Sequence, residues 1–365
     1  MTDPLRAAIS QLPAPGASPT TIVFRQHTAS VALTCDLPTA LTAATSTLYS
    51  YTTHPAGPAA WQIVIVAEPP TNPAAWDCAF AGTITRDIGP NVSARKLALF
   101  GLDVWWIPDR SSLIRLDPRR RLILVNCPPD AARDWSTRLT RQAMTAQLLR
   151  QGVVYAHAAA FIYRGQGIAV AGLKGAGKTT TLIAALRHLG ADFVTNDRLL
   201  LHTDGKTLVG HAWPHRLHIG AGTLHAYSDF TALAATSDTK ATVEPPDIPG
   251  LLTSGSIRNA CHLTVMLWPT LTLDQPTPGA AEPVEPEEVR ATLIGTRFFT
   301  VDRARGYAAR INHWLIPQPE SDRNAHIRAA AEAVANTVPC FRLPVGPSPA
   351  GTAAGLAEVI WRATG

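Results

Sequence analysis

The sequence has no run of about 18 uninterrupted apolar residues, the length that a membrane-spanning helix requires. Residues 1–12 lack the basic stretch followed by an apolar stretch that marks a secretory signal. Charged residues are also scarce, at 16% of the chain against 46% hydrophobic residues, and the 365 residues are enough for two domains. We therefore expect a cytoplasmic globular protein that has no membrane partner.

Cysteine is sparse and shows no pattern. The five cysteines occur without a C-x-x-C pair and without a metal-like cluster: Cys35, Cys78, Cys127, Cys261 and Cys340. A disulfide scaffold or a cysteine zinc site would need paired spacings. Free thiols in a reducing compartment are the expectation.

The positive charge is too small and too scattered to indicate a nucleic-acid partner. The net charge is +5, and the basic stretch Arg119–Arg121 is short and lacks interleaved aromatic residues. A nucleic-acid-binding surface normally carries a longer basic stripe. A phosphate-bearing substrate or an acidic peptide accounts for the surplus equally well.

The first part of the chain predicts a β-rich (α+β) domain. Short runs of β-branched and aromatic residues, separated by turn-forming residues, indicate strands over 21–25, 31–35, 61–67, 103–107 and 122–126. Neighbouring Trp105 and Trp106 would point to opposite faces of their strand. At least one is expected in the core, and the other is a candidate for docking a peptide.

The second part alternates strands and helices, which predicts an α/β fold. An amphipathic helix is expected over 131–151, because Gly152 ends the periodic pattern. Strands are then expected over 153–163, 167–171, 192–195, 199–202, 207–211 and 261–268, with helices over 180–189, 321–336 and 350–362. Residues 274–288, rich in proline and acidic residues, are expected to form a solvated loop. We place the domain boundary at residue 130, which gives domains 1–130 and 131–365.

The most specific motif is a phosphate-binding loop of the Walker A (P-loop) pattern, G-x-x-x-x-G-K-[ST]. It runs from Gly172 through Gly175, Ala176 and Gly177 to Lys178 and Thr179, with Thr180 following. The glycines let backbone N–H groups turn toward an anion, the lysine reaches the β/γ-phosphates, and the threonine hydroxyl holds Mg²⁺. A strand before the loop and a helix after it place the phosphate at a helix N-terminus. The motif predicts that a nucleoside triphosphate, ATP or GTP, is bound with Mg²⁺.

Further residues around this loop resemble the catalytic domain of the bacterial HPr kinase/phosphorylase family. His157 precedes a hairpin, the loop and its helix follow, and an apolar strand then ends in Asn196-Asp197-Arg198. The similarity covers about residues 153–225. It implies a P-loop, HPr-kinase-like C-terminal domain, and it implies homo-oligomers, which family members often form.

The resemblance also implies roles for individual residues. Lys178 and Thr179 would handle phosphate and Mg²⁺, His157 would lie near the phosphates, and Asp197 would serve as base and metal ligand. Asn196 stands where the family has the first of two aspartates. The family's second conserved loop has only a loose counterpart at 255–259.

Homologous domains act as tailoring kinases in natural-product peptide biosynthesis, so the resemblance favours transfer of a γ-phosphate to a hydroxyl. The acceptor would be a Ser or Thr of a peptide, or a small molecule, which the first domain would recognise. Two alternatives stay open. One is a non-catalytic nucleotide-binding regulator, which the missing aspartate favours, and the other is a simple NTPase.

Several polar residues outside the motif are less specific. Four histidines crowd one segment: His211, His215, His218 and His225. Their spacing could suit zinc on a helix, but Pro214 argues against a helix there. A polar connection lining the acceptor side is the favoured interpretation. Lys240 and Arg258 are candidates to neutralise the transferred phosphoryl group, with surface positions as the simpler interpretation.

Overall fold

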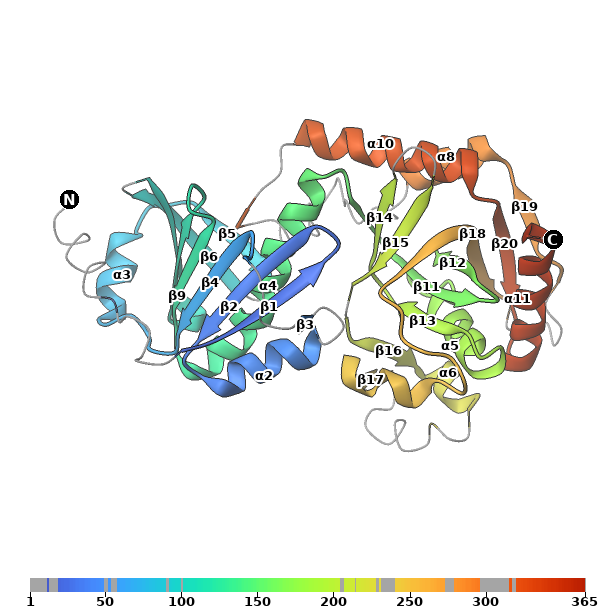
Figure 1. Cartoon of the computed structure of the whole chain (residues 1–365), viewed down its shortest axis with the longest axis horizontal. Coiled ribbons are helices and arrows are strands. Elements are labelled where there is room, and N and C mark those ends of the chain that lie inside the picture. Colours follow the sequence, from blue (N-terminus) through green and yellow to red (C-terminus); the bar gives the residue numbers. More distant parts are fainter. Residues whose placement is uncertain are drawn as a thin grey trace. The chain divides into compact units, whose positions relative to one another are not determined.

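The chain forms two compact units in a computed structural model (Figure 1). The first comprises residues 1–150 and 303–318, and the second comprises 151–302 and 319–365. The structure describes residues 12, 19–48, 52–53, 58–89, 92–99, 101–203, 207–213, 215–227, 230, 240–272, 279–295, 315–316 and 320–364. Pro214 and part of the predicted loop 274–288 lie outside these residues. Both units combine sheets and helices, so the mixed α/β class is confirmed.

The first unit is built on one mixed sheet. Over the described residues this sheet has nine strands in the order β3-β1-β2-β4-β9-β8-β7-β6-β5. Its elements are β1 (Thr20–Gln26), β2 (Ala29–Cys35), α2 (Pro38–Thr47), β3 (Thr52–Thr53), β4 (Trp61–Val66), α3 (Pro73–Ala79), β5 (Thr85–Gly89), β6 (Val92–Leu99), β7 (Leu102–Ile107), η2 (Pro108–Arg110), β8 (Ser112–Asp117), β9 (Leu122–Asn126) and α4 (Pro129–Arg150). The five predicted strands are present, while β3, β5, β6 and β8 were not foreseen.

Helix α4 packs on the first sheet. It contacts β2, β4 and α2, and Ser136 Oγ donates to the Ala40 carbonyl at 2.8 Å. Gln147 bonds both the N–H and the carbonyl of Ser30, each at 3.1 Å. The boundary predicted at residue 130 would assign this helix to the second domain, whereas its buried face covers strands of the first unit. An amphipathic pattern shows which face is buried, but not which sheet buries it.

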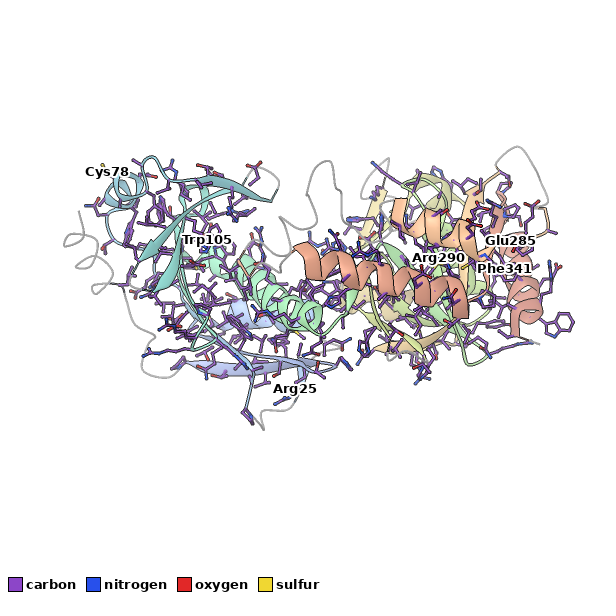
Figure 2. All side chains as sticks on the ribbon, turned by 90° about the horizontal axis from the view of Figure 1, so that it is seen from above. Arg25, Cys78, Trp105, Glu285, Arg290 and Phe341 are labelled. Atoms are coloured by element: carbon purple, nitrogen blue, oxygen red, sulfur yellow. The ribbon has the colours of Figure 1, made fainter. Side chains whose placement is uncertain are left out.

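Both adjacent tryptophans of β7 are buried. Trp105 and Trp106 are each 1% exposed, and Trp105 lies inside the first unit (Figure 2). Trp106 packs with Trp76 and Phe80 on one face of the sheet and donates to Asp77 Oδ1 at 3.0 Å. The interpretation of one of the pair as a peptide-docking residue was wrong, because neither side chain is exposed.

The second unit is built on a sheet whose strand order, over the described residues, is β10-β14-β15-β18-β12-β11-β13, with β20 beside β18 and β19 beside β20. Its elements are β10 (Val154–Ala156), β11 (Ala158–Tyr163), β12 (Gln166–Ala171), α5 (Lys178–His188), β13 (Asp192–Thr195), β14 (Leu199–Thr203), β15 (Leu208–Ala212), β16 (Leu217–Gly220), α6 (Ala221–His225), β17 (Lys240–Val243), η4 (Pro245–Leu251), β18 (Ala260–Leu271), β19 (Glu282–Val284), α8 (Pro286–Gly295), α10 (Glu320–Thr337), β20 (Cys340–Val345) and α11 (Pro349–Thr364). The predicted solvated loop was wrong over its second half, where β19 and the start of α8 lie.

Two apolar cores lie on opposite faces of this sheet. Side chains alternate along each strand, so Ile168 and Val170 of β12 face a core with residues of α5 and α11. Ala169 and Ala171 face a core with residues of α8 and α10. The result is a sheet covered by helices on both faces, and α8 and α10 are seen along one side of it in Figure 1.

Strand β12 approaches β18 so closely that only glycine fits at one position. A Cβ on Gly167 would overlap the His262 carbonyl oxygen and lie 2.9 Å from Cys261 Cβ. We expect Gly167→Ala to lower the free energy of unfolding by about 1–3 kcal/mol, because backbone atoms must separate. The measurement is urea unfolding. Gly222→Ala is the matched control, since its Cβ would meet nothing within 4 Å, and it should be as stable as the parent or more stable.

The sheets and helices leave all five cysteines as free thiols, four of them buried and Cys78 exposed. Across the described ranges, no helix combines the length and apolar character needed to cross a membrane.

Candidate functional site

The topology of the second unit brings three sequence motifs to one edge of its sheet. Strand β11 pairs antiparallel with β12 on one side and with β13 on the other. The start of β11 therefore lies between the C-terminal ends of the two neighbours, and strands are about 4.8 Å apart. His157 precedes β11, the loop 172–177 follows β12, and Asn196-Asp197 follows β13. Residues far apart in the sequence thus meet at one sheet edge.

The glycine loop, Gly172–Gly177, joins β12 to α5 through a backbone that favours glycine. Gly175 and Gly177 have φ of 86° and 107°, in the left-handed region that side chains disfavour. Gly177 is also the N-cap residue of α5, and among the described residues no side chain caps this helix. The first N–H groups of α5 have no partner within the helix, so they are available to an anion.

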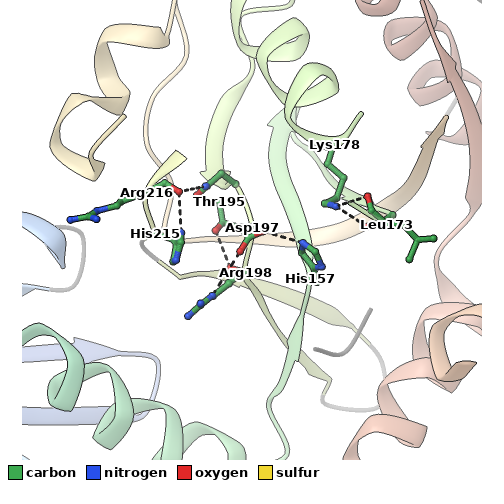
Figure 3. A network of polar contacts seen from close by, with 10 residues as sticks. His157, Leu173, Lys178, Thr195, Asp197, Arg198, His215 and Arg216 are labelled. Atoms are coloured by element: carbon green, nitrogen blue, oxygen red, sulfur yellow. Dashed lines mark hydrogen bonds and ion pairs between the residues drawn. The ribbon is translucent and has the colours of Figure 1, made fainter. Parts of the chain in front are cut away.

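Lys178 lies at the first position of α5 and turns back over the loop. Its Nζ donates to the Gly172 carbonyl at 2.7 Å and to the Leu173 carbonyl at 3.1 Å, as Figure 3 shows. Burial lowers the pKa of Lys178, and the nearby carboxylate of Asp197 partly opposes that effect. The ammonium group therefore lies within the electrostatic reach of Asp197.

The remaining residues of the motif and Asp197 are of the types that bind phosphate and Mg²⁺. Ala176 packs tightly on the loop, because a Cβ on Gly172 would lie 3.1 Å from the Ala176 Cβ. Thr179 is the second residue of α5, and Thr180 shares a hydrogen bond of 2.8 Å with Thr223 Oγ1 on α6. Hydroxyl and carboxylate oxygens, such as those of Thr179 and Asp197, are ligands that Mg²⁺ prefers. The residues thus suit a nucleoside triphosphate with Mg²⁺.

His157 and Asp197 form a pair at the centre of this edge. His157 Nε2 lies 3.1 Å from Asp197 Oδ1, and Arg198 Nε lies 3.9 Å from Asp197 Oδ2. The continuous strand predicted over 153–163 is broken at His157, where the chain passes from pairing with β14 to pairing with β12 and β13. The interruption turns the imidazole toward Asp197 (Figure 3).

Asp197 is held in its ionised form. Burial alone would raise its pKa, but the hydrogen bond from His157 and the positive charges of His157, Arg198 and His215 outweigh burial, so the pKa lies well below its usual value. An ionised carboxylate that is only half exposed can accept a hydrogen bond from a hydroxyl or bind a cation.

The side chain of Asn196 contacts a later segment of the chain. It is buried, at 7% exposure, and its Nδ2 donates to the Arg216 carbonyl at 2.8 Å. His215 Nδ1 lies 3.0 Å from the same carbonyl. The amide therefore ties the end of β13 to the segment before β16. This role was not foreseen, because Arg216 lies 20 residues further along the chain.

We expect Asn196→Asp, which restores an aspartate pair, to lower the free energy of unfolding by about 1–3 kcal/mol without raising any phosphotransfer rate. A carboxylate cannot donate to the Arg216 carbonyl and would be buried without that partner. Urea unfolding measures the loss, and Asn196→Ala separates the lost hydrogen bond from the added charge. If Asn196→Asp were as stable as the parent, that result would contradict a stabilising hydrogen bond from Asn196 to the Arg216 carbonyl.

The segment 255–259 lies away from this edge. Arg258 Nε lies 2.8 Å from Asp192 Oδ2, and Ser256 donates to Asp192 Oδ1 from both N and Oγ, at 2.7 and 2.9 Å. Asp192 begins β13 whereas Asp197 follows its end, so the two carboxylates belong to opposite ends of this strand. In the structure, this segment binds Asp192 at the start of β13, which is the end of the strand opposite to Asp197. It does not form a second loop around a phosphate, and Arg258 does not neutralise one.

Comparison with known proteins adds a distant likeness. No protein-family model matches the chain, and no curated protein matches it. Among solved structures, the chain is similar to the HPr(Ser) kinase/phosphatase from Coxiella burnetii, at 14% sequence identity and a TM-score of 0.29, over 57% of this chain and 91% of that chain. A likeness at this TM-score carries no argument about function, so the functional argument rests on the residues of the site.

Proposed function

We propose that the protein is a kinase that transfers the γ-phosphoryl group of ATP to a hydroxyl group. The observation that carries the proposal is the juxtaposition of the glycine loop, with its uncapped helix, and the His157–Asp197 pair at one sheet edge. A phosphate site beside an ionised carboxylate is what phosphoryl transfer to a hydroxyl requires. GTP remains a second candidate donor.

The glycine loop would bind the triphosphate. Backbone N–H groups of the loop and of Thr179 and Thr180 would surround the phosphates, and Lys178 would exchange its loop carbonyls for phosphate oxygens. Thr179 and Asp197 would hold Mg²⁺. When bound, that ion supplies charge that offsets the negative charge of the transferred group.

Asp197 would orient the acceptor. Its carboxylate would accept a hydrogen bond from the hydroxyl and take the proton as the new P–O bond forms and the bond to ADP breaks. Its low pKa makes it a weak base, but phosphoryl transfer depends mainly on positioning and charge stabilisation. His157 would hold the carboxylate in place through its Nε2–H. A serine or threonine of a peptide, as in peptide natural-product biosynthesis, and a small-molecule hydroxyl are both candidate acceptors.

A second candidate is a nucleotide-binding regulator that transfers nothing. The presence of Asn196 favours it, because the site then has one carboxylate where the resembled family has two. A simple NTPase would differ from both by releasing phosphate without an acceptor.

The test is incubation of the purified chain with ATP, Mg²⁺ and a panel of hydroxyl-bearing peptides and metabolites. Mass spectrometry of the acceptors and release of free phosphate are followed in parallel. A phosphorylated acceptor supports the kinase. Phosphate without a phosphorylated acceptor indicates an NTPase, and tight nucleotide binding without either product indicates the regulator.

A further inference from the structure

A small two-stranded sheet beside the candidate site has one buried and one polar face. Strands β16 and β17 pair antiparallel, so His218 lies opposite Thr242 and Gly220 lies opposite Lys240. The intervening residues are buried in the core shared with α5: Leu217, Ile219, Ala241 and Val243. Because side chains alternate across a strand, the other face carries polar groups. We call this surface the β16–β17 polar face; it comprises Arg216, His218, Lys240, Thr242 and Glu244.

Three contacts fix this small sheet against the motifs of the sheet edge. Asn196 donates to the Arg216 carbonyl just before β16. Thr180, directly after the glycine-loop motif, bonds Thr223 on α6, and α6 packs on both strands. Helix α5 itself contacts β16. The polar face therefore keeps a constant position relative to the glycine loop and Asp197.

The polar face is positively charged. Its described side chains include two cationic groups, Arg216 and Lys240, and one carboxylate, Glu244, and Arg216 Nε lies 2.8 Å from Glu244 Oε1. His218 Nδ1 lies 3.0 Å from Thr242 Oγ1. Asp197 does not reverse this balance, because His157 and Arg198 lie against its carboxylate.

His218 links the polar face to the site. Burial lowers the pKa of His218, Lys240 and Arg216 lower it further, and Asp197 and Glu244 raise it. The imidazole thus lies within electrostatic reach of both Lys240 and Asp197. A molecule whose hydroxyl contacts Asp197 can extend along this face.

We propose that the β16–β17 polar face binds the phosphoryl acceptor, and that this acceptor carries a carboxylate or a phosphate near its hydroxyl. This inference rests on the proposed kinase function. A negative group at Lys240 and His218 would form charge-assisted hydrogen bonds, whereas a neutral hydroxyl compound would have no charge to match the face. The anion would also offset the unfavourable effect of Lys240 on a protonated His218.

The test follows the His218 imidazole by NMR in the full chain without nucleotide, assigned by comparison with His218→Gln. The probes are glycerate, glycerol 3-phosphate and glycerol, which share a hydroxyl and differ in the charged group. We expect one or both anionic probes to raise the His218 pKa in a saturable way, and the responding probe identifies the group that the face prefers. Glycerol should leave it unchanged. An equal response to glycerol, or none to either anion, would overturn the proposal.

Two variants separate this face from the glycine loop, which also attracts anions. Lys240→Glu should weaken binding of the anionic probe at least about tenfold, the loss of one charge-assisted hydrogen bond. Lys178→Ala should leave the His218 response unchanged. Equal binding by Lys240→Glu, or loss in Lys178→Ala, contradicts the assignment. Because the titration needs no nucleotide, its failure leaves the kinase proposal intact. An anion response from a probe that is not phosphorylated, while other hydroxyl compounds are, would refute the acceptor role alone.

Discussion

Replacement of Lys178 by alanine is expected to reduce phosphoryl transfer by at least about 10²–10³-fold, the loss typical of removing one preorganised donor to developing charge. The ammonium group lies over the glycine loop, bonded to the Gly172 and Leu173 carbonyls. The measurements are product formation with ATP and Mg²⁺ and the Kd for ATP.

The control for this variant is Lys174→Ala. Lys174 is in the same loop but is exposed, so its removal should change the rate little. Stability should change by no more than about 0.5–1.5 kcal/mol per lost loop bond in Lys178→Ala, which urea unfolding can verify. Retained turnover in folded Lys178→Ala would contradict the assignment of the loop.

Replacement of Asp197 by asparagine is expected to slow transfer by about 10²–10⁴-fold, the contribution typical of a positioned acid or base. The amide keeps the shape of the side chain but can neither take the acceptor's proton nor offset the charge of Mg²⁺. Binding of ADP without Mg²⁺ should be nearly unchanged, because the glycine loop is intact. Steady-state rates and ADP titrations measure the two effects.

Asp192→Asn is the matched control, since Asp192 begins the same strand that Asp197 follows. Its carboxylate accepts three hydrogen bonds from Ser256 and Arg258, so this variant should lose about 1–3 kcal/mol of stability while keeping the transfer rate of the folded enzyme. If Asp192→Asn lost as much activity as Asp197→Asn, the effect would not depend on which end of β13 carries the aspartate. That result would contradict the assignment of Asp197 to the site.

The Asp197 pair also predicts a pH dependence of stability. Because its folded pKa is depressed, the stabilisation from Asp197 is fully present above its unfolded pKa of about 3.9 and is lost as pH falls toward the lower folded pKa. The difference in unfolding free energy between the parent and Asp197→Asn, measured by urea unfolding, should therefore shrink as the pH falls below about 4. A difference that stays the same down to about pH 3 would contradict the depressed pKa of Asp197.

Local sequence signals predicted much of the second unit. Strand β12, helix α5, β13 and the long helices α10 and α11 agree with their expected ranges to within a few residues, since hydrophobic periodicity and glycine stops act within one element. The glycine motif was readable for the same reason. Its turn depends on φ values at Gly175 and Gly177, not on distant contacts.

Other features depended on contacts between distant residues. Strands β16 and β17 were not predicted, because each is short and is stabilised by its partner and by the core under α5. Helix α4 was recognised, but its assignment to the first unit depends on which sheet it covers. The catalytic interpretation of Asn196 also changes with the tertiary structure, since the carbonyl that it binds belongs to a later segment.

The sequence alone determined that a glycine loop lies between a strand and a helix, and that a histidine and an aspartate lie near it along the chain. These properties are local, because backbone dihedrals and side-chain periodicity are set by residues a few positions apart. Only the tertiary structure decided that His157 contacts Asp197, that Arg258 belongs to the opposite sheet edge, and that the β16–β17 polar face lies beside the site. Those outcomes follow from strand order and direction, which place the start of β11 between the ends of β12 and β13.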